Sequence, residues 1–176
     1  MSTPTTHRDF RLIDSTLRDG SHAISHQYTE DDVISIVKGL DAAGVEVIEI
    51  AHGDGLGGSS FNYGFSKVDE KLLIARACEA TTNAEIACLL LPGIGVADDL
   101  REVKELGVNV ARIAVHCTEA DITEQHIKVA KKLEMEAIGF LMMSHMSTPE
   151  DLVKQALLMQ SYGADTLYIA DSAGAM

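Results

Sequence analysis

The chain has 176 residues, of which 14 are Lys or Arg and 27 are Asp or Glu, so its formal net charge is −13. This balance argues against binding to nucleic-acid phosphates or anionic lipid, because no broad basic face is available. Apolar residues make up 46% of the chain and charged residues 23%, which is typical of a globular protein. The length suits one domain, and no apolar stretch is long enough to span a bilayer.

The cysteines indicate a reducing compartment. Cys78, Cys88 and Cys117 are widely spaced, odd in number and form no CxxC motif. The first ten residues are polar and contain no apolar signal segment. We therefore expect reduced thiols in the core of a cytoplasmic protein.

Strand-like and helix-like segments alternate along the chain. Apolar, β-branched runs predict six strands, at 10–15, 45–51, 85–91, 108–115, 136–143 and 166–170. Helical periodicity predicts five helices between them, at about 30–43, 68–81, 96–106, 118–133 and 149–162.

Capping signals mark the expected helix starts. Thr29 with Asp32 and Thr118 with Asp121 have the spacing of a capping box. Pro149 suits the first position of a helix, where its missing N–H costs no hydrogen bond.

Strict alternation indicates parallel strands joined by helical crossovers. Two architectures fit this pattern. One is an open, doubly wound sheet, which 176 residues would complete. The other is a TIM (β/α)₈ barrel, which needs roughly 250 residues, so the chain would be a partial barrel with the first six strands and five helices. Periodicity alone does not choose between them.

Chemically capable side chains fall where the expected strands end. In parallel α/β folds the carboxyl ends of the strands face the ligand site. The residues at these ends are Arg18, Asp19, His22, Glu49, His52, His116, His145 and Ser172. Four of the seven histidines therefore fall at one rim, which favours a functional site, although histidines that are merely solvated would give the same pattern.

The first strand end carries the strongest candidates. Asp19 suits a hard cation such as Mg²⁺ or Mn²⁺, although a helix cap or a salt bridge would also explain it. Arg18 is able to bind a carboxylate or an enolate, or to form a surface ion pair. His22 is able to act as a base near neutral pH. Glu49 would face inward, and a buried carboxylate there needs a partner, for which Arg18 is the obvious choice.

A glycine-rich segment over 53–64 follows the second strand. Gly53, Gly55 and Gly58 have the G-x-G-x-x-G spacing, but no helix opens directly after them and the Gly-Lys-Ser/Thr ending of a P-loop is absent. We therefore predict a mobile rim loop or lid rather than a phosphate site.

The segment 12–22, which contains Thr16-Leu17-Arg18-Asp19-Gly20-Ser21-His22, resembles the opening of the DRE-TIM metallolyases. This TIM-barrel superfamily includes hydroxymethylglutaryl-CoA lyase, isopropylmalate and homocitrate synthases, and the pyruvate aldolases. The Asp, Arg and Glu of its name match Asp19, Arg18 and Glu49.

Further stretches resemble the 4-hydroxy-2-oxovalerate aldolase branch of this superfamily. They are 51–64, 89–93, 112–121 and 170–176. The Gly-Ser-His that follows Arg18 and Asp19 argues against the synthases. The resemblance covers essentially the whole chain, and it decides for the barrel over the open sheet.

The resemblance implies a class II pyruvate aldolase that cleaves 4-hydroxy-2-oxopentanoate to pyruvate and acetaldehyde. The implied cofactor is Mn²⁺ or another divalent cation such as Mg²⁺ or Co²⁺. By resemblance, Asp19 is a metal ligand, Arg18 stabilises the enolate and His22 removes the 4-hydroxyl proton. Ser172 would contact the substrate together with Arg18 and Asp19, and Glu49 would hold Arg18. The other rim histidines receive no role.

The resemblance also implies a hetero-oligomer with an acylating acetaldehyde dehydrogenase, in the catabolism of aromatic compounds. The family's His-x-His metal pair and its substrate-orienting tyrosine would fall after Met176. We therefore expect residues 1–176 to be the N-terminal part of a pyruvate carboxyltransferase-type barrel domain, with negligible activity alone. The alternatives are a related acyl-CoA lyase or synthase, or a catalytically inactive half-barrel.

Overall fold

A computed structural model describes residues 10–175, which form one six-stranded parallel sheet with five α-helices and three short 3₁₀ helices. The strands are β1 (Ile13–Asp14), β2 (Val47–Glu49), β3 (Glu85–Leu90), β4 (Val110–His116), β5 (Glu136–Met142) and β6 (Thr166–Ile169). The α-helices are α1 (Glu30–Ala42), α2 (Glu70–Ala80), α3 (Ala97–Leu106), α4 (Glu124–Lys132) and α5 (Pro149–Tyr162). The 3₁₀ helices are η1 (Asp19–Ile24), η2 (Ala120–Thr123) and η3 (Ser144–Met146). The polar segment 1–9 and Met176, on which some sequence expectations fall, lie outside the described residues.

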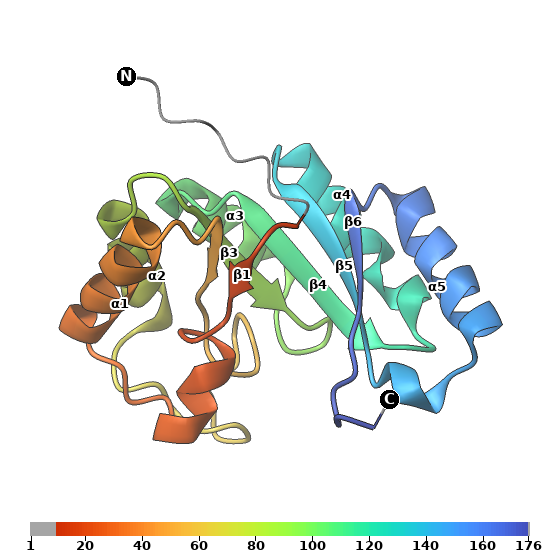
Figure 1. The fold of residues 1–176 in the computed structure, drawn as a ribbon, viewed down its shortest axis with the longest axis horizontal. Helices are drawn as coiled ribbons and strands as arrows, with labels where there is room; N and C mark the ends of the chain where they lie inside the picture. Colours follow the sequence, from red (N-terminus) through yellow and green to blue (C-terminus); the bar gives the residue numbers. More distant parts are fainter. Residues whose placement is uncertain (1–9, 176) are drawn as a thin grey trace.

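The strand order decides between the two predicted architectures. Each strand pairs in parallel with the next one in sequence, in the order β1-β2-β3-β4-β5-β6. A doubly wound sheet would reverse its strand order part of the way across. Crossovers between parallel strands are right-handed in nearly all proteins, so sequential order places the helices on one face of the sheet. Figure 1 shows the helices along the outer side of a curved sheet, with α1 and α2 at one flank and α5 at the other. The predicted partial TIM barrel is confirmed, and the open doubly wound alternative is wrong.

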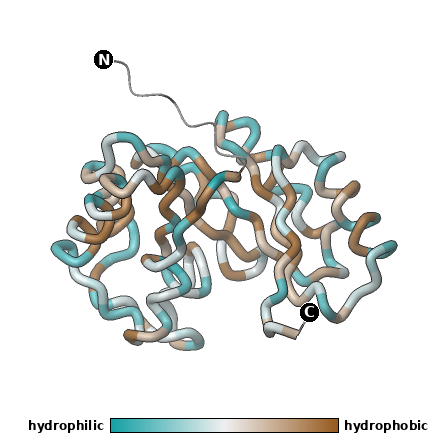
Figure 2. Tube along the Cα trace, in the orientation of Figure 1, coloured by the Kyte–Doolittle hydropathy of each residue, from teal (hydrophilic) through white to brown (hydrophobic). Residues whose placement is uncertain are grey.

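The two faces of the sheet carry two separate apolar clusters. The larger cluster packs between the strands and the helices, and it includes the fully buried Ile48, Ile86 and Ile113. The smaller cluster lies on the opposite, concave face and consists of Val47, Ala87, Val110 and Ile138, with Ile13 and Tyr168 against it. Figure 2 shows the apolar residues following the strands, with polar residues on the outer turns of the helices.

Side-chain alternation carries charged residues onto the concave face. Successive side chains of a strand point to opposite faces, so residues two apart share a face. Glu49 lies two residues after Val47, and Arg112 lies two residues after Val110. Both therefore point into the interior of the half-barrel, beyond its apolar layer.

One predicted capping box is present and the other is absent. Thr29 Oγ1 accepts a hydrogen bond from the Asp32 N–H at 3.2 Å, and the Asp32 carboxylate accepts one from the Thr29 N–H at 2.9 Å. The box expected at Thr118 is wrong, because that segment begins as η2 and α4 starts only after it. The Thr118 hydroxyl instead lies 2.8 Å from Nδ1 of His116.

The first strand is shorter than the predicted 10–15. Its regular pairing covers only Ile13 and Asp14. Before it, the side chain of Arg11 reaches across the amino ends of two other strands, 2.5 Å from Glu85 and 2.6 Å from Glu136. This three-residue contact ties together the pole of the sheet opposite to the strand carboxyl ends.

The glycine-rich loop after β2 is packed against the sheet in its first half, contrary to the expected lid. The Leu56 N–H donates to the Leu89 carbonyl at 2.8 Å, and Leu56 is 2% exposed. Gly55 has a φ of +82°, and a Cβ there would lie 2.8 Å from the same carbonyl oxygen. Glycine is therefore required for the loop to approach β3 so closely.

The three cysteines are free, as expected for reduced thiols. Burial raises the pKa of Cys78 to about 11 and the pKa of Cys88 well above its ordinary value. Within residues 10–175, no helix has both the length and the apolar character that crossing a bilayer requires.

The larger cluster should dominate stability. We expect Ile113→Ala to lower the free energy of unfolding by about 2–5 kcal/mol, because it removes buried methyl groups and leaves a cavity. The matched control is Ile122→Ala, which removes the same atoms from a side chain that is 47% exposed on η2. Urea denaturation of both variants measures the difference, and equal losses would contradict this account of the core.

Candidate active site

Arg18 and Asp19 lie at the carboxyl end of the sheet, as predicted. They follow β1 after three intervening residues, in a turn where the Ser15 carbonyl accepts from the N–H groups of Arg18 and Gly20 at 3.1 and 3.2 Å. The helix η1 begins at Asp19. In Figure 1, η1 and the segment after β6 lie at the same end of the sheet, so the first strand end belongs to the mouth of the half-barrel.

A buried carboxylate orients two guanidinium groups inside this mouth. Glu49 is fully buried, and its Oε2 lies 2.8 Å from Nε of Arg18. Its other oxygen, Oε1, lies 2.6 Å from Nη1 of Arg112. Arg18 Nη1 also lies 2.9 Å from Oδ1 of Asp19. The expected contact between Arg18 and Glu49 is therefore present, and it fixes the direction of the guanidinium toward the mouth.

Sequence reasoning missed Arg112 as part of this network. Its guanidinium carbon lies 4.7 Å from the ring centre of Phe140 and 5.3 Å from that of Tyr168, so it stacks over both rings. The available signal was a lone charge within the otherwise apolar strand β4, on the same face as Val110. A buried charge of this kind requires a partner, and Glu49 is that partner.

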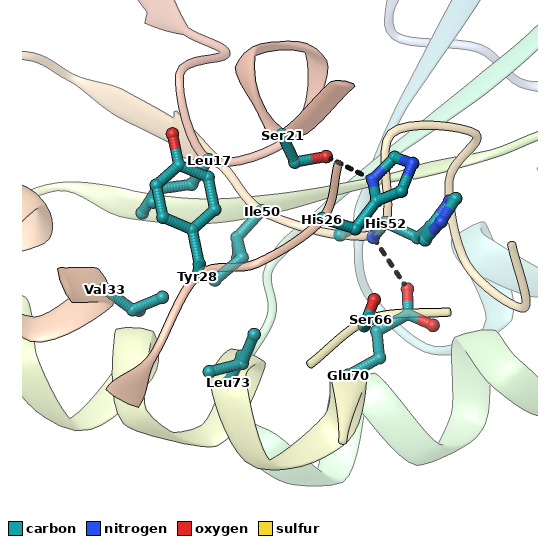
Figure 3. Close-up of a pocket in the computed structure, with 11 residues that line it drawn as sticks. Leu17, Ser21, His26, Tyr28, Val33, Ile50, His52, Ser66, Glu70 and Leu73 are labelled. Carbon is teal, nitrogen blue, oxygen red and sulfur yellow. Dashed lines mark hydrogen bonds between the residues drawn. The ribbon is translucent and has the colours of Figure 1, made fainter. Parts of the chain in front are cut away.

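The histidine predicted as a base belongs to a row of three imidazoles. His22 is exposed on η1, and its ring centre lies 5.1 Å from that of His26. His26 stacks on His52 at 3.7 Å, and its Nδ1 lies 2.9 Å from the hydroxyl oxygen of Ser21. Figure 3 shows His26 between Ser21 and His52. A Cβ at Gly53 would lie 2.5 Å from the His22 ring, so a larger residue there would displace this exposed ring.

Burial disfavours the charged form of the two inner imidazoles, those of His26 and His52. Desolvation is the larger cause that lowers the pKa of His26, and the charge of the nearby His22 is the second. Desolvation, followed by His26, lowers the pKa of His52. Beneath them, the carboxylate of Glu70 accepts from the N–H groups of His52 and Gly57, each at 3.2 Å, and burial raises its pKa. The first of these bonds is drawn in Figure 3.

Only two of the four expected rim histidines lie in this row. His22 and His52 belong to it, with ring centres 6.5 Å apart. His116 contacts Thr118 instead, and Nδ1 of His145 lies 3.7 Å from a carboxylate oxygen of Asp171. His26 was missed because it follows η1 rather than a strand end, although it comes only four residues after His22.

Ser172 is placed at the mouth without touching the first strand end. Its hydroxyl oxygen accepts a hydrogen bond from the Met143 N–H at 3.0 Å. In the described part of the chain, no hydrogen bond joins Ser172 to Arg18 or Asp19. The hydroxyl hydrogen of Ser172 remains available to a bound molecule.

Asp19 has the chemistry and the exposure of a ligand for a hard cation. Its side chain is 66% exposed, and Arg18 contacts only Oδ1. Oδ2 accepts no hydrogen bond from residues 10–175. One carboxylate oxygen is therefore free at the mouth, which fits a single coordination position of a divalent ion.

The comparisons with known proteins place this parallel half-barrel, with its Arg-Asp turn after the first strand, in a family. The profile of the family described as HMGL-like matches residues 9–176. The chain belongs to this family, which is part of the DRE-TIM superfamily expected from the sequence.

The curated relatives are more specific. The chain is 59% identical over 169 residues to a 4-hydroxy-2-oxovalerate aldolase of Carboxydothermus hydrogenoformans, which covers 96% of this chain and 50% of the relative. It is 54% identical over 176 residues to 4-hydroxy-2-oxovalerate aldolase 6 of Rhodococcus jostii, covering 100% of this chain and 50% of that protein. The chain thus spans about half the length of the curated relatives it matches.

Solved structures share the fold at low sequence identity. The carboxyl transferase domain of Rhizobium etli pyruvate carboxylase, solved with pyruvate, superposes with a TM-score of 0.78 at 13% identity, over 97% of this chain and 32% of that one. A 2,3-dimethylmalate lyase superposes with a TM-score of 0.58 at 12% identity, over 90% of this chain and 56% of that one. These similarities establish the barrel architecture.

The Glu49 network should be critical for stability. Glu49→Gln keeps the shape of the side chain but removes the charge between two largely buried guanidiniums. We expect it to lower the free energy of unfolding by about 3–5 kcal/mol. Glu85→Gln removes one contact of the more exposed Arg11 and should cost less than about 1 kcal/mol. Urea denaturation compares the two, and a similar small loss for both would show that the Glu49 contacts contribute little.

Proposed function

We propose that the protein containing this chain is a divalent-metal-dependent aldolase that cleaves 4-hydroxy-2-oxopentanoate, also called 4-hydroxy-2-oxovalerate, to pyruvate and acetaldehyde. The observation that carries this proposal is the Arg18–Asp19 turn, fixed by the buried Glu49 at the mouth of the half-barrel. The names and 54–60% identities of the curated relatives support the substrate.

His22 is the proposed base. Its exposed ring at the mouth takes the proton from the 4-hydroxyl group of the substrate. The bond between C3 and C4 then breaks, acetaldehyde leaves, and the bonding electron pair passes to the C2–C3 unit as the enolate of pyruvate. Protonation at C3 completes the reaction, so atoms and charge balance.

Arg18 is the proposed enolate-stabilising group. Because Glu49 binds its Nε, the terminal nitrogens are directed away from the buried carboxylate and toward the mouth. Negative charge that develops on the enolate oxygen is stabilised by such a pre-oriented cation more strongly than by water, which would have to reorganise. A lysine has a single nitrogen and is unable to make the Glu49 contact and the substrate contact in the same geometry.

Asp19 is the proposed protein ligand, through its free Oδ2, for Mn²⁺ or for Mg²⁺ or Co²⁺. When bound, such an ion supplies Lewis-acid polarisation of the 2-keto group. The contact between Arg18 and Oδ1 of Asp19 keeps the two side chains adjacent, so the ligand and the enolate-stabilising group act on the same end of the substrate.

Ser172 and the partner complete the proposal. Ser172 lies at the same mouth, and its hydroxyl hydrogen is free to donate to the substrate carboxylate. Acetaldehyde is reactive, so we also propose a hetero-oligomer with an acylating acetaldehyde dehydrogenase, in the cytoplasm and in the catabolism of aromatic compounds. These assignments rest on the resemblance of the sequence.

A related lyase or synthase acting on an acyl-CoA is the second candidate, because the family description HMGL-like covers it. Release of pyruvate from 4-hydroxy-2-oxopentanoate by the full gene product is expected. Release of CoA from hydroxymethylglutaryl-CoA without pyruvate formation would favour the second candidate instead. An assay of the 176-residue chain alone tests whether it is a catalytically inactive half-barrel. We expect it to show negligible turnover.

Removal of the proposed metal ligand should abolish activity without unfolding the protein. We expect Asp19→Ala in the full gene product to lose metal-dependent pyruvate release, because the free carboxylate oxygen disappears while the buried Glu49 contacts remain. Asp121→Ala, at an exposed aspartate on η2, is the matched control. Pyruvate formation at saturating Mn²⁺ is the measurement, and wild-type turnover by Asp19→Ala would remove Asp19 from the site.

The shape of the guanidinium should matter as well as its charge. We expect Arg18→Lys to lower kcat by about 10²–10³-fold, the usual cost of losing one pre-oriented stabilising group. Arg101→Lys, on the outer face of α3, should leave kcat unchanged. Steady-state kinetics of the two variants give the comparison, and an unchanged kcat for Arg18→Lys would contradict the proposed role.

A further inference from the structure

A second group of ligand-type side chains lies beside the proposed site. One ligand atom each from His22, His26 and Asp54 lies within 4.8 Å of the others. These residues come from η1, from the segment just after it, and from the loop after β2. Asp19 is not a member of this group. We propose that His22, His26 and Asp54 bind a borderline divalent ion such as Zn²⁺, at a site distinct from the Asp19 position.

The donor set determines the class of ion. Two imidazole nitrogens and one carboxylate oxygen are ligands that suit Zn²⁺, whereas Mg²⁺ and Ca²⁺ prefer sites made of oxygen. Three protein ligands leave at least one position for water or a bound molecule. The site is therefore expected to select zinc-like ions over the hard cations that suit a lone carboxylate such as Asp19.

The proposed ligand His26 is held in place by the surrounding structure. His26 has a φ of 59° and the preceding Ser25 a φ of 52°, and two successive non-glycine residues in the left-handed region are disfavoured. This backbone turns the His26 ring inward, where it stacks on His52 and contacts Ser21 (Figure 3). A hydrogen-bonded partner on the far nitrogen is the usual way in which proteins orient a metal-binding histidine.

The other two ligands are accessible and able to adjust. His22 is exposed, and the Asp54 side chain is 28% exposed, so an ion is able to enter from the mouth and both groups are able to rotate onto it. Gly53 allows the His22 ring to approach the loop. The neighbouring positive charge of Arg18 is paired with Glu49 and Asp19, which reduces its repulsion of a cation.

Occupancy would have a functional consequence. An ion bound to His22 occupies the nitrogen lone pair that the proposed base needs. Zinc should therefore inhibit the aldolase reaction even when the Asp19 position is filled. This consequence rests on the proposed function, whereas binding of the ion does not.

The test is zinc binding by the full gene product in the Asp19→Asn background, with excess Mg²⁺, measured by equilibrium dialysis against a chromophoric zinc indicator. We expect one zinc ion per chain whose binding requires His26 and Asp54, counted separately from any zinc held by the His-x-His pair expected after Met176. Adding His26→Asn or Asp54→Asn should weaken binding by at least about tenfold, and adding His116→Asn should not. Asp54→Asn is the more conservative change, since it keeps the shape of a partly exposed side chain whose oxygen lies 3.5 Å from Nδ1 of His52.

Each outcome decides the proposal. Loss of zinc binding in Asp19→Asn alone would overturn it, because the ion would then belong to the Asp19 position. Equal binding by the proteins with and without His26→Asn and Asp54→Asn would also overturn it. If zinc binds as expected but does not slow pyruvate release by the Mn²⁺-loaded protein, the metal site stands and the assignment of His22 as the base is wrong.

Discussion

The structure depends on one buried carboxylate shared by two guanidinium groups. Glu49 is inside the half-barrel because β2 alternates, and Arg18 and Arg112 reach it from the turn after β1 and from the middle of β4. Three strands are therefore linked through one side chain. Burying such charges is favourable only when every partner is present, so the same contacts that direct Arg18 to the mouth also fix how these strands meet.

The sequence predicted the fold in outline and missed the features that depend on tertiary contacts. The alternation of strand-like and helix-like segments predicted the strands and helices. Strand order depends on tertiary contacts, so only the resemblance to the DRE-TIM metallolyases favoured the barrel over the open sheet. Arg112 and His26 were not predicted because Arg112 lies inside a strand and His26 follows η1, so neither stands at a strand end. The capping box at Thr118 failed because the segment that follows begins as η2 rather than as an α-helix, and the Thr118 hydroxyl contacts His116 instead. The placement of Asp19, Arg18 and Glu49 at the mouth was predicted correctly, because their positions next to strands suffice to place them.

The mouth combines two kinds of ligand chemistry within a short distance. Asp19 offers a single hard oxygen beside a guanidinium, while His22 and His26 offer nitrogen donors beside Asp54. Gly53 lets the His22 ring rest against the loop in this position, because a side chain there would push the ring aside. Because the two groups lie close together, the position that a cation occupies depends on the geometry of its ligands as well as on its affinity for nitrogen or oxygen.

The three-residue contact of Arg11 with Glu85 and Glu136 lies at the pole of the sheet opposite to the mouth. It links the starts of β1, β3 and β5, at the opposite pole from the loops that form the mouth. A scaffold secured at its base in this way tolerates insertions and replacements in the opposite loops, because such changes do not propagate into strand alignment. Related proteins with this fold are thus able to differ in the molecules that their loops bind while the alignment at the amino ends of the strands is kept.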